Sequence, residues 1–217
     1  MLMRRLLPFF LLIFTVPLQA QRMRGAPGTG NPEERLVPWR FLEKGADIAK
    51  APVVLYWLPA SLDETKKSPL LTSRELFDDS LRCVNFIVVL PTDSATIERL
   101  GATGKLPMVV ITDGDKVSRI VPKIRPAAVE QALREELSAR DDSMYRDMTE
   151  ARRLAASDKN VSISLYRRIW DQRCLFPTAG SDAQRALKSL GVTVVDTPAS
   201  PPSDPNLKVV KPTSPPH

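Results

Sequence analysis

Histidine and cysteine are almost absent from this sequence of 217 residues. The one histidine, His217, is the last residue, and the two cysteines are Cys83 and Cys174. The position of His217 excludes Ser-His-Asp catalysis, Cys-His catalysis and histidine-rich metal sites from the folded part. Two cysteines cannot build a four-cysteine zinc site or an iron–sulfur cluster. We therefore expect no catalytic residues, no metal site and no cofactor.

The sequence also lacks a concentrated basic region. Its net charge is +6, but lysine and arginine are scattered among acids, and the longest basic runs are pairs such as Lys66-Lys67 and Arg152-Arg153. Nucleic-acid binding would favour a basic stripe with aromatic residues between the charges. We expect no nucleic-acid partner, and the composition, with 43% hydrophobic and 26% charged residues, is that of a globular protein.

The N-terminal residues are typical of an export signal. Arg4 and Arg5 precede an apolar run at residues 6–16, and Ala20 follows at a position suited to cleavage. An uncleaved anchor is the alternative, although the run is shorter than the roughly 20 residues of a usual membrane span. The sequence predicts a signal peptide at 1–20 and a periplasmic or secreted protein without stable membrane insertion.

The centre of the chain has the pattern of an α/β protein. Residues 52–58 and 84–90 are apolar runs that predict strands buried on both faces, and a helical crossover between them predicts parallel pairing. Asp113-Gly114 separates two further apolar runs and predicts a hairpin. A short helix is expected within 39–50 and another at 94–100.

A helical part should follow, beginning at Pro126, which suits a first helical turn. The first helix is expected to place four apolar residues on one face, namely Val129, Ala132, Leu133 and Leu137. Three further helices are marked by Met144, Met148 and Ala151, then by Ile163, Tyr166, Trp170 and Cys174, then by Ala183, Ala186, Leu187 and Leu190. Ser181 is expected to cap the last helix.

These elements divide the chain into five predicted parts. They are a signal peptide at 1–20, a flexible leader at 21–34, an α/β domain at 35–140, a helical extension at 141–196 and a disordered tail at 197–217. The tail prediction rests on its prolines, of which there are seven among the last twenty residues.

The region from Trp39 to Leu137 resembles the thioredoxin fold, and most closely the secreted domains related to bacterial thiol:disulfide interchange proteins. The similarity is carried by the strands at 53–57 and 85–90, and by Lys105-Leu-Pro107-Met before the hairpin. The resemblance implies a thioredoxin-like sandwich, a central mixed sheet flanked by helices. The helices beyond residue 143 weakly resemble a degenerate tetratricopeptide pair, but we favour the interpretation that they form a helical cap packed on the sheet.

The resemblance also implies a peptide-binding groove, and it places Trp57, Pro59, Leu106 and Pro107 there, with a cis bond before Pro107. The alternative is that Pro107 only starts a strand. In the family a Cys-x-x-Cys pair follows the first central strand, but the corresponding residues 59–65 contain no cysteine. Attack and resolution in disulfide exchange need two nearby thiols, so we expect the protein to be redox-inactive.

Cys83 and Cys174 allow three interpretations. They could form a disulfide that joins the helical extension to the α/β domain, remain inert buried thiols, or include one reactive thiol. The paired acids at 78–79, 113 and 115, and 141–142 are expected in solvated turns and helix ends.

Three functions follow from these patterns. The first is an exported, redox-inactive protein that binds or scaffolds another envelope or secreted protein. The second is a thiol-disulfide oxidoreductase, or an accessory to one, using Cys83 or Cys174 with a partner's cysteine. The third is a structural secreted domain whose proline-rich tail carries the binding.

Overall fold

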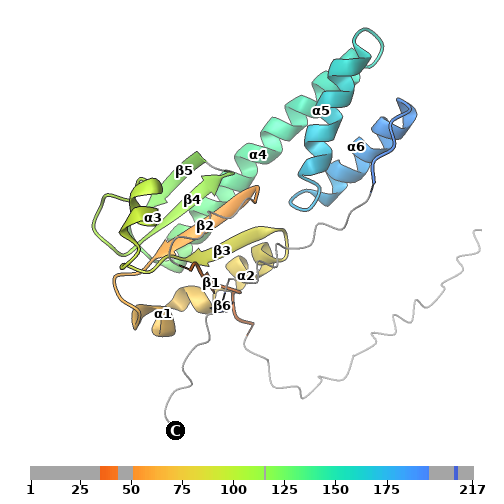
Figure 1. The fold of residues 1–217 in the computed structure, drawn as a ribbon. Helices are drawn as coiled ribbons and strands as arrows, with labels where there is room; N and C mark the ends of the chain where they lie inside the picture. The colour runs from red at the N-terminus through yellow and green to blue at the C-terminus, as the bar shows by residue number, and fades with distance from the viewer. Residues whose placement is uncertain (1–34, 44–50, 115, 196–207, 210–217) are drawn as a thin grey trace, which may run out of the picture. The chain divides into compact units, whose positions relative to one another are not determined.

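The computed structural model describes residues 35–43, 51–114 and 116–195, together with the backbone of Lys208–Val209. The predicted signal peptide and leader, at 1–34, lie outside these residues. The structure is mixed α/β with a C-terminal helical part, so the predicted class is confirmed (Figure 1). Within the described residues, no helix is long and apolar enough to cross a membrane.

A mixed sheet forms the centre of the fold. Its strands lie in the order β5-β4-β2-β3-β1, and the two-residue β6 extends it at the β1 edge. The strands β1, β3 and β2 are parallel, whereas β4 pairs antiparallel with both β2 and β5. The bounds are β1 Arg40–Phe41, β2 Val53–Leu58, β3 Val84–Val88, β4 Met108–Asp113, β5 Lys116–Val121 and β6 Lys208–Val209.

Helices cover both faces of this sheet, and the last three helices also form the C-terminal helical part. Their bounds are α1 Glu64–Lys67, the 3-10 turn η1 Pro69–Leu71, α2 Arg74–Ser80, α3 Ser94–Arg99, α4 Pro126–Leu154, α5 Lys159–Asp171 and α6 Pro177–Ser189. As predicted, Pro126 begins α4. Asp93 caps α3, and Gly101 follows that helix with a φ of 64°. Ser73 caps α2 by accepting a hydrogen bond of 3.2 Å from the amide of Leu76.

The central strand β2 is buried on both faces because its side chains alternate between two apolar clusters. Val53, Leu55 and Trp57 pack with residues of α2 and the first half of α4. Val54, Tyr56 and Leu58 pack on the opposite face, where Leu100 and Ile97 cover the sheet. Helices α4 and α3 therefore cover opposite faces (Figure 1). A continuous apolar run is what such a strand requires.

A third apolar cluster holds the helical part together. The C-terminal half of α4 contributes Met144, Met148 and Ala151, and these side chains pack against α5 and α6. The N-terminal half of the same helix packs on the sheet through Val129 and Leu133. The helix α4 therefore belongs to both parts, and the predicted boundary between residues 140 and 141 falls inside it.

Within 39–50, where a short helix is expected, the described residues include strand β1 at Arg40–Phe41, and 44–50 lie outside the described residues. Three other predictions of local structure need correction. The helix expected around Met144 is the continuation of α4, since no glycine or proline breaks it. Helix α6 begins at Pro177, ahead of Ser181, because proline suits the first turn. The tail contributes strand β6, which pairs with β1, and its other residues are not described.

Candidate binding site

The predicted groove residues lie at the end of the sheet where β2 finishes and β4 begins. The last pair in this ladder is Leu58 with Met108. One residue further along each strand are Pro59 and Pro107, so the two prolines occupy neighbouring positions at the sheet end. The Leu106-Pro107 bond is cis.

The segment after β2 is held by hydrogen bonds between its own side chains and its backbone. The Ser61 hydroxyl accepts a bond of 3.4 Å from the amide of Glu64, and a Glu64 carboxylate oxygen accepts one of 2.8 Å from the amide of Ala60. Thr65 is buried, and its hydroxyl donates to the carbonyl of Leu62 at 2.6 Å. These polar groups therefore shape the turn into α1.

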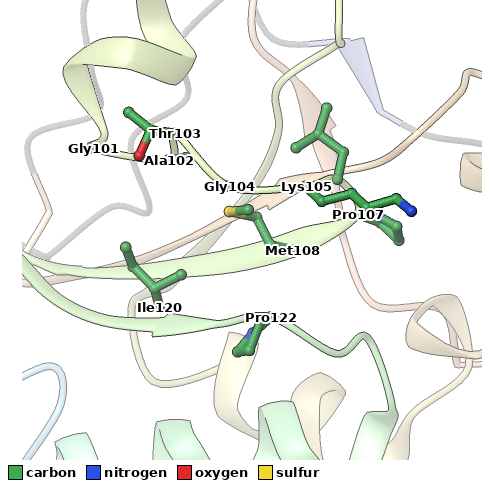
Figure 2. Close-up of a pocket in the computed structure, with 10 residues that line it drawn as sticks. Gly101, Ala102, Thr103, Gly104, Lys105, Pro107, Met108, Ile120 and Pro122 are labelled. Atoms are coloured by element: carbon green, nitrogen blue, oxygen red, sulfur yellow. The ribbon is translucent and has the colours of Figure 1, made fainter.

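A shallow pocket of about 470 Å³ adjoins the Leu106-Pro107 bond. One wall is the loop 101–107, which links α3 to β4, and the other comes from Ile120 and Pro122 at the end of β5. Figure 2 shows Met108 and Ile120 directed to the same side of the hairpin, toward this loop. Most of the lining is apolar, and Lys105 is the ionisable residue in it.

Only two of the four predicted groove residues reach this pocket. Leu106 and Pro107 line it and are half-buried. Trp57 has no exposed surface, since its ring packs edge-on against Trp39 at a centroid distance of 5.4 Å. Pro59 is also buried. Trp57 points to the α4 face of the sheet, so it is a core residue and cannot contact a ligand in the pocket.

Sequence reasoning missed the contribution of β5 to the pocket. The sequence predicts a hairpin strand after Gly114 but no site residue within that strand. The available signal was Ile120 itself, an aliphatic residue on a strand whose other members are mostly polar or charged. Its position beside Met108 depends on the β4–β5 register, which places Ile120 opposite Val110.

Cys83 and Cys174 form a disulfide, and their Cα atoms are 5.8 Å apart. Both residues are half-buried. Cys83 follows α2 and has a φ of 62°, a backbone conformation that residues other than glycine rarely adopt. Cys174 lies in the turn after α5, which ends at Asp171, so it does not share the apolar helix face predicted for it. The disulfide therefore joins the end of α2 to the α5–α6 turn.

A second depression, of about 540 Å³, lies between α2 and α4; charged residues predominate in its lining, which also includes Leu137 and Phe176. Asp79 and Arg82 lie shortly before Cys83 in the chain, and Phe176 lies shortly after Cys174; all three contribute to the lining. Burial raises the pKa of Asp79 above its usual value of 3.8; the Arg82 charge opposes that rise, and Glu75 adds to it. Burial therefore disfavours the charged form of Asp79 in this depression.

The described residues provide no cluster of three or more histidine, cysteine or acidic side chains that could hold a metal ion. Of the acids expected in solvated turns, Asp113 instead forms an ion pair with Arg140 of α4, although it remains largely exposed. Comparisons of this chain with protein-family models, with curated proteins and with solved structures gave no match.

Proposed function

We propose that this protein is an exported, redox-inactive thioredoxin-like protein that binds another envelope or secreted protein at the pocket beside Pro107. The strand order β5-β4-β2-β3-β1 supports the thioredoxin-like part of the proposal, because three parallel strands followed by an antiparallel hairpin resemble that fold. The apolar run near the N-terminus supports export.

The apolar pocket of about 470 Å³ is the observation that carries the binding function. Such concave, mainly apolar surfaces with few polar groups are typical of binding sites. Its one ionisable side chain, Lys105, has no acid or base beside it in the lining, so the pocket offers contact surface and no paired groups for proton transfer. A protein partner with an exposed apolar side chain fits this surface.

Site-specific photo-crosslinking tests this proposal. A photoreactive residue at Thr103, which lines the pocket, should form one dominant crosslink to an envelope or secreted protein. The same residue at Thr149, which is exposed on the far half of α4, serves as the matched control. Equal crosslinking from both positions, or none from Thr103, would contradict the proposed site.

The half-buried disulfide beside the second depression favours one alternative function, thiol-disulfide exchange. A partner thiolate would attack one sulfur of the bridge and release the other as a thiolate; a second thiol of the partner would then displace the mixed disulfide, which leaves the partner oxidised and both cysteines reduced. Dithiothreitol-dependent insulin reduction distinguishes the two functions. We expect no turnover, and turnover that disappears in Cys83→Ser would favour the oxidoreductase.

A further inference from the structure

Strand β5 forms an edge of the sheet that no other described strand covers. It pairs with β4 on one side, whereas the opposite edge of the sheet carries β6 on β1. Five of its six residues are exposed, and only Val121 is buried. An edge strand directs part of its backbone amides and carbonyls away from its neighbour, where another extended chain can pair with them.

Two aliphatic side chains on this edge lie on the face that α3 only partly covers. Ile120 lies opposite Val110 and Val117 lies opposite Thr112, so both share the sheet face of the second apolar cluster. Ile120 is 42% exposed and Val117 is 40% exposed. Ile120 also lines the pocket beside Pro107 (Figure 2), so this residue belongs to both the edge strand and the pocket.

The same edge carries positive charge. From Lys116 to Arg125 the sequence has four basic residues and no acid. One of them, Arg119, is paired with Glu135 of α4, whereas Lys116 and Lys123 are exposed and have no ion pair to a described residue. An extended chain with carboxylates near its ends would complement these lysines.

We propose that β5 is a strand-addition site for an extended acidic segment of a partner protein, with one aliphatic side chain of that segment in the pocket beside Ile120. This inference deepens the proposed binding function and rests on it. Backbone pairing along β5 supplies binding energy, and the pocket and the two lysines supply selectivity.

The local irregularity of β5 supports selectivity for an acidic partner over a second copy of this chain. The ladder shifts register between Ile111 and Thr112, and the Ser118 hydroxyl donates a hydrogen bond of 3.1 Å to the Ile111 carbonyl. Bulges and lysines are features that protect sheet edges from pairing with like strands. Two β5 strands would bring basic side chains together, while an acidic segment neutralises them.

Fluorescence anisotropy with a labelled peptide tests the inference. The probe has alternating valine and threonine between two glutamates at each end and about nine residues in all, a common strand length. The comparison peptide has lysine in place of glutamate. The protein should bind the acidic probe and not the basic one, and the affinity should fall as salt is added.

Charge-reversed variants locate the site. The pair Lys116→Glu and Lys123→Glu should weaken binding of the acidic probe about tenfold. The matched pair Lys159→Glu and Lys188→Glu, on the exposed surfaces of α5 and α6, should leave it unchanged. Circular dichroism confirms that each variant folds, and amide shifts in NMR spectra should concentrate in β5.

Other results overturn the inference and separate it from the proposed function. The double variant Lys116→Glu and Lys123→Glu could bind the probe as tightly as the parent, while Thr103→Trp, which fills the pocket, loses binding. That combination would support the pocket site and contradict the strand site. Failure of the acidic probe to bind, while the Thr103 crosslink persists, would also remove it. A dimer in light scattering that protects β5 amides would identify a second copy as the occupant.

Discussion

Loss of the Cys83–Cys174 bridge should be the most damaging single change to this protein's stability. The bridge spans 91 positions of sequence. In the chain-entropy model, closing a loop of that length removes enough freedom from the unfolded chain to stabilise the fold by about 4–5 kcal/mol. Because domains are stable by only about 5–15 kcal/mol, Cys174→Ala should remove a large share of the free energy of unfolding.

The structure also shows which part of the protein depends on the bridge. Leu175, beside Cys174, packs in the cluster on the α4 face of the sheet, and Phe176 contacts both that cluster and the helical one. The second half of α4 still binds α5 and α6 through Met144 and Met148. We therefore expect the α5–α6 turn to detach first, while the three helices stay associated.

Denaturant unfolding with and without a reductant measures the effect. The midpoint should fall markedly when reductant is added, Cys174→Ala should show the same low midpoint without it, and reductant should not affect that variant further. Hydrogen exchange should show lost protection around residues 174–176 before α4 is affected. Identical unfolding curves in oxidised and reduced protein would refute this reasoning.

A pair of double variants separates the bridge from the backbone conformation of Cys83. At its φ of 62°, alanine is strained by about 1 kcal/mol and glycine is not. With Cys174→Ala as the common background, Cys83→Gly should therefore be more stable than Cys83→Ala by about that amount. If the alanine variant is equally stable, the positive φ carries no cost.

Three further substitutions should change stability in directions that the structure specifies. Asp79→Asn should be more stable than the parent at neutral pH, because burial raises the pKa of Asp79 and so disfavours its charged form. The gain in the free energy of unfolding should be below about 1 kcal/mol, because solvent screens the charge. It should vanish as the pH falls below 3.8, where the carboxyl is protonated in both the folded and the unfolded protein. Arg140→Met should cost about 3 kcal/mol in chemical denaturation, because it leaves the Glu136 carboxylate, whose side chain is only 12% exposed, without its ion pair at 3.2 Å. Gly180→Ala should lower the melting temperature, since the added Cβ would lie 2.9 Å from the Arg173 Cα.

Matched controls decide these three tests. A gain for Asp79→Asn that persists unchanged at low pH would show that the carboxylate charge is not the cause. Arg153→Met removes a pair with Glu150 that is largely exposed, and it should leave the denaturation midpoint nearly unchanged. Ser181→Ala, at an exposed position of the same helix as Gly180, should be nearly neutral. A stabilising Gly180→Ala would mean that α6 can move away from Arg173.

The helix α4 illustrates how far sequence patterns determine this fold. Its start at Pro126 and its first apolar face follow from local sequence. Its continuation to Leu154 was missed because the polar stretch 138–143 interrupts the apolar stripe. That stretch spans the passage from the sheet to the other helices, and there Arg140 binds Glu136, Asp113 and the Pro52 carbonyl. A tertiary network therefore holds the segment in which the periodic signal is weak.

For the candidate site as well, local sequence accounts for some features and tertiary packing for others. Leu106 and Pro107 lie at the sheet end because they directly precede β4, whose apolar run is recognisable in the sequence. The family resemblance grouped Trp57 and Pro59 with them, but both are buried. Strand alternation assigns a residue to a face, but which face is covered depends on the helices that pack there.

The sequence by itself determined the buried strands, the Asp113-Gly114 hairpin and the shortage of catalytic side chains, because residue type and short-range periodicity are sufficient for these. Only the tertiary structure decided the disulfide between Cys83 and Cys174, the antiparallel pairing of Lys208–Val209 with β1 and the exposure of β5. Each of these depends on contacts between segments far apart in the chain. Local patterns do not specify which distant segments come into contact. Those contacts depend on how the apolar face of α4 packs against the sheet.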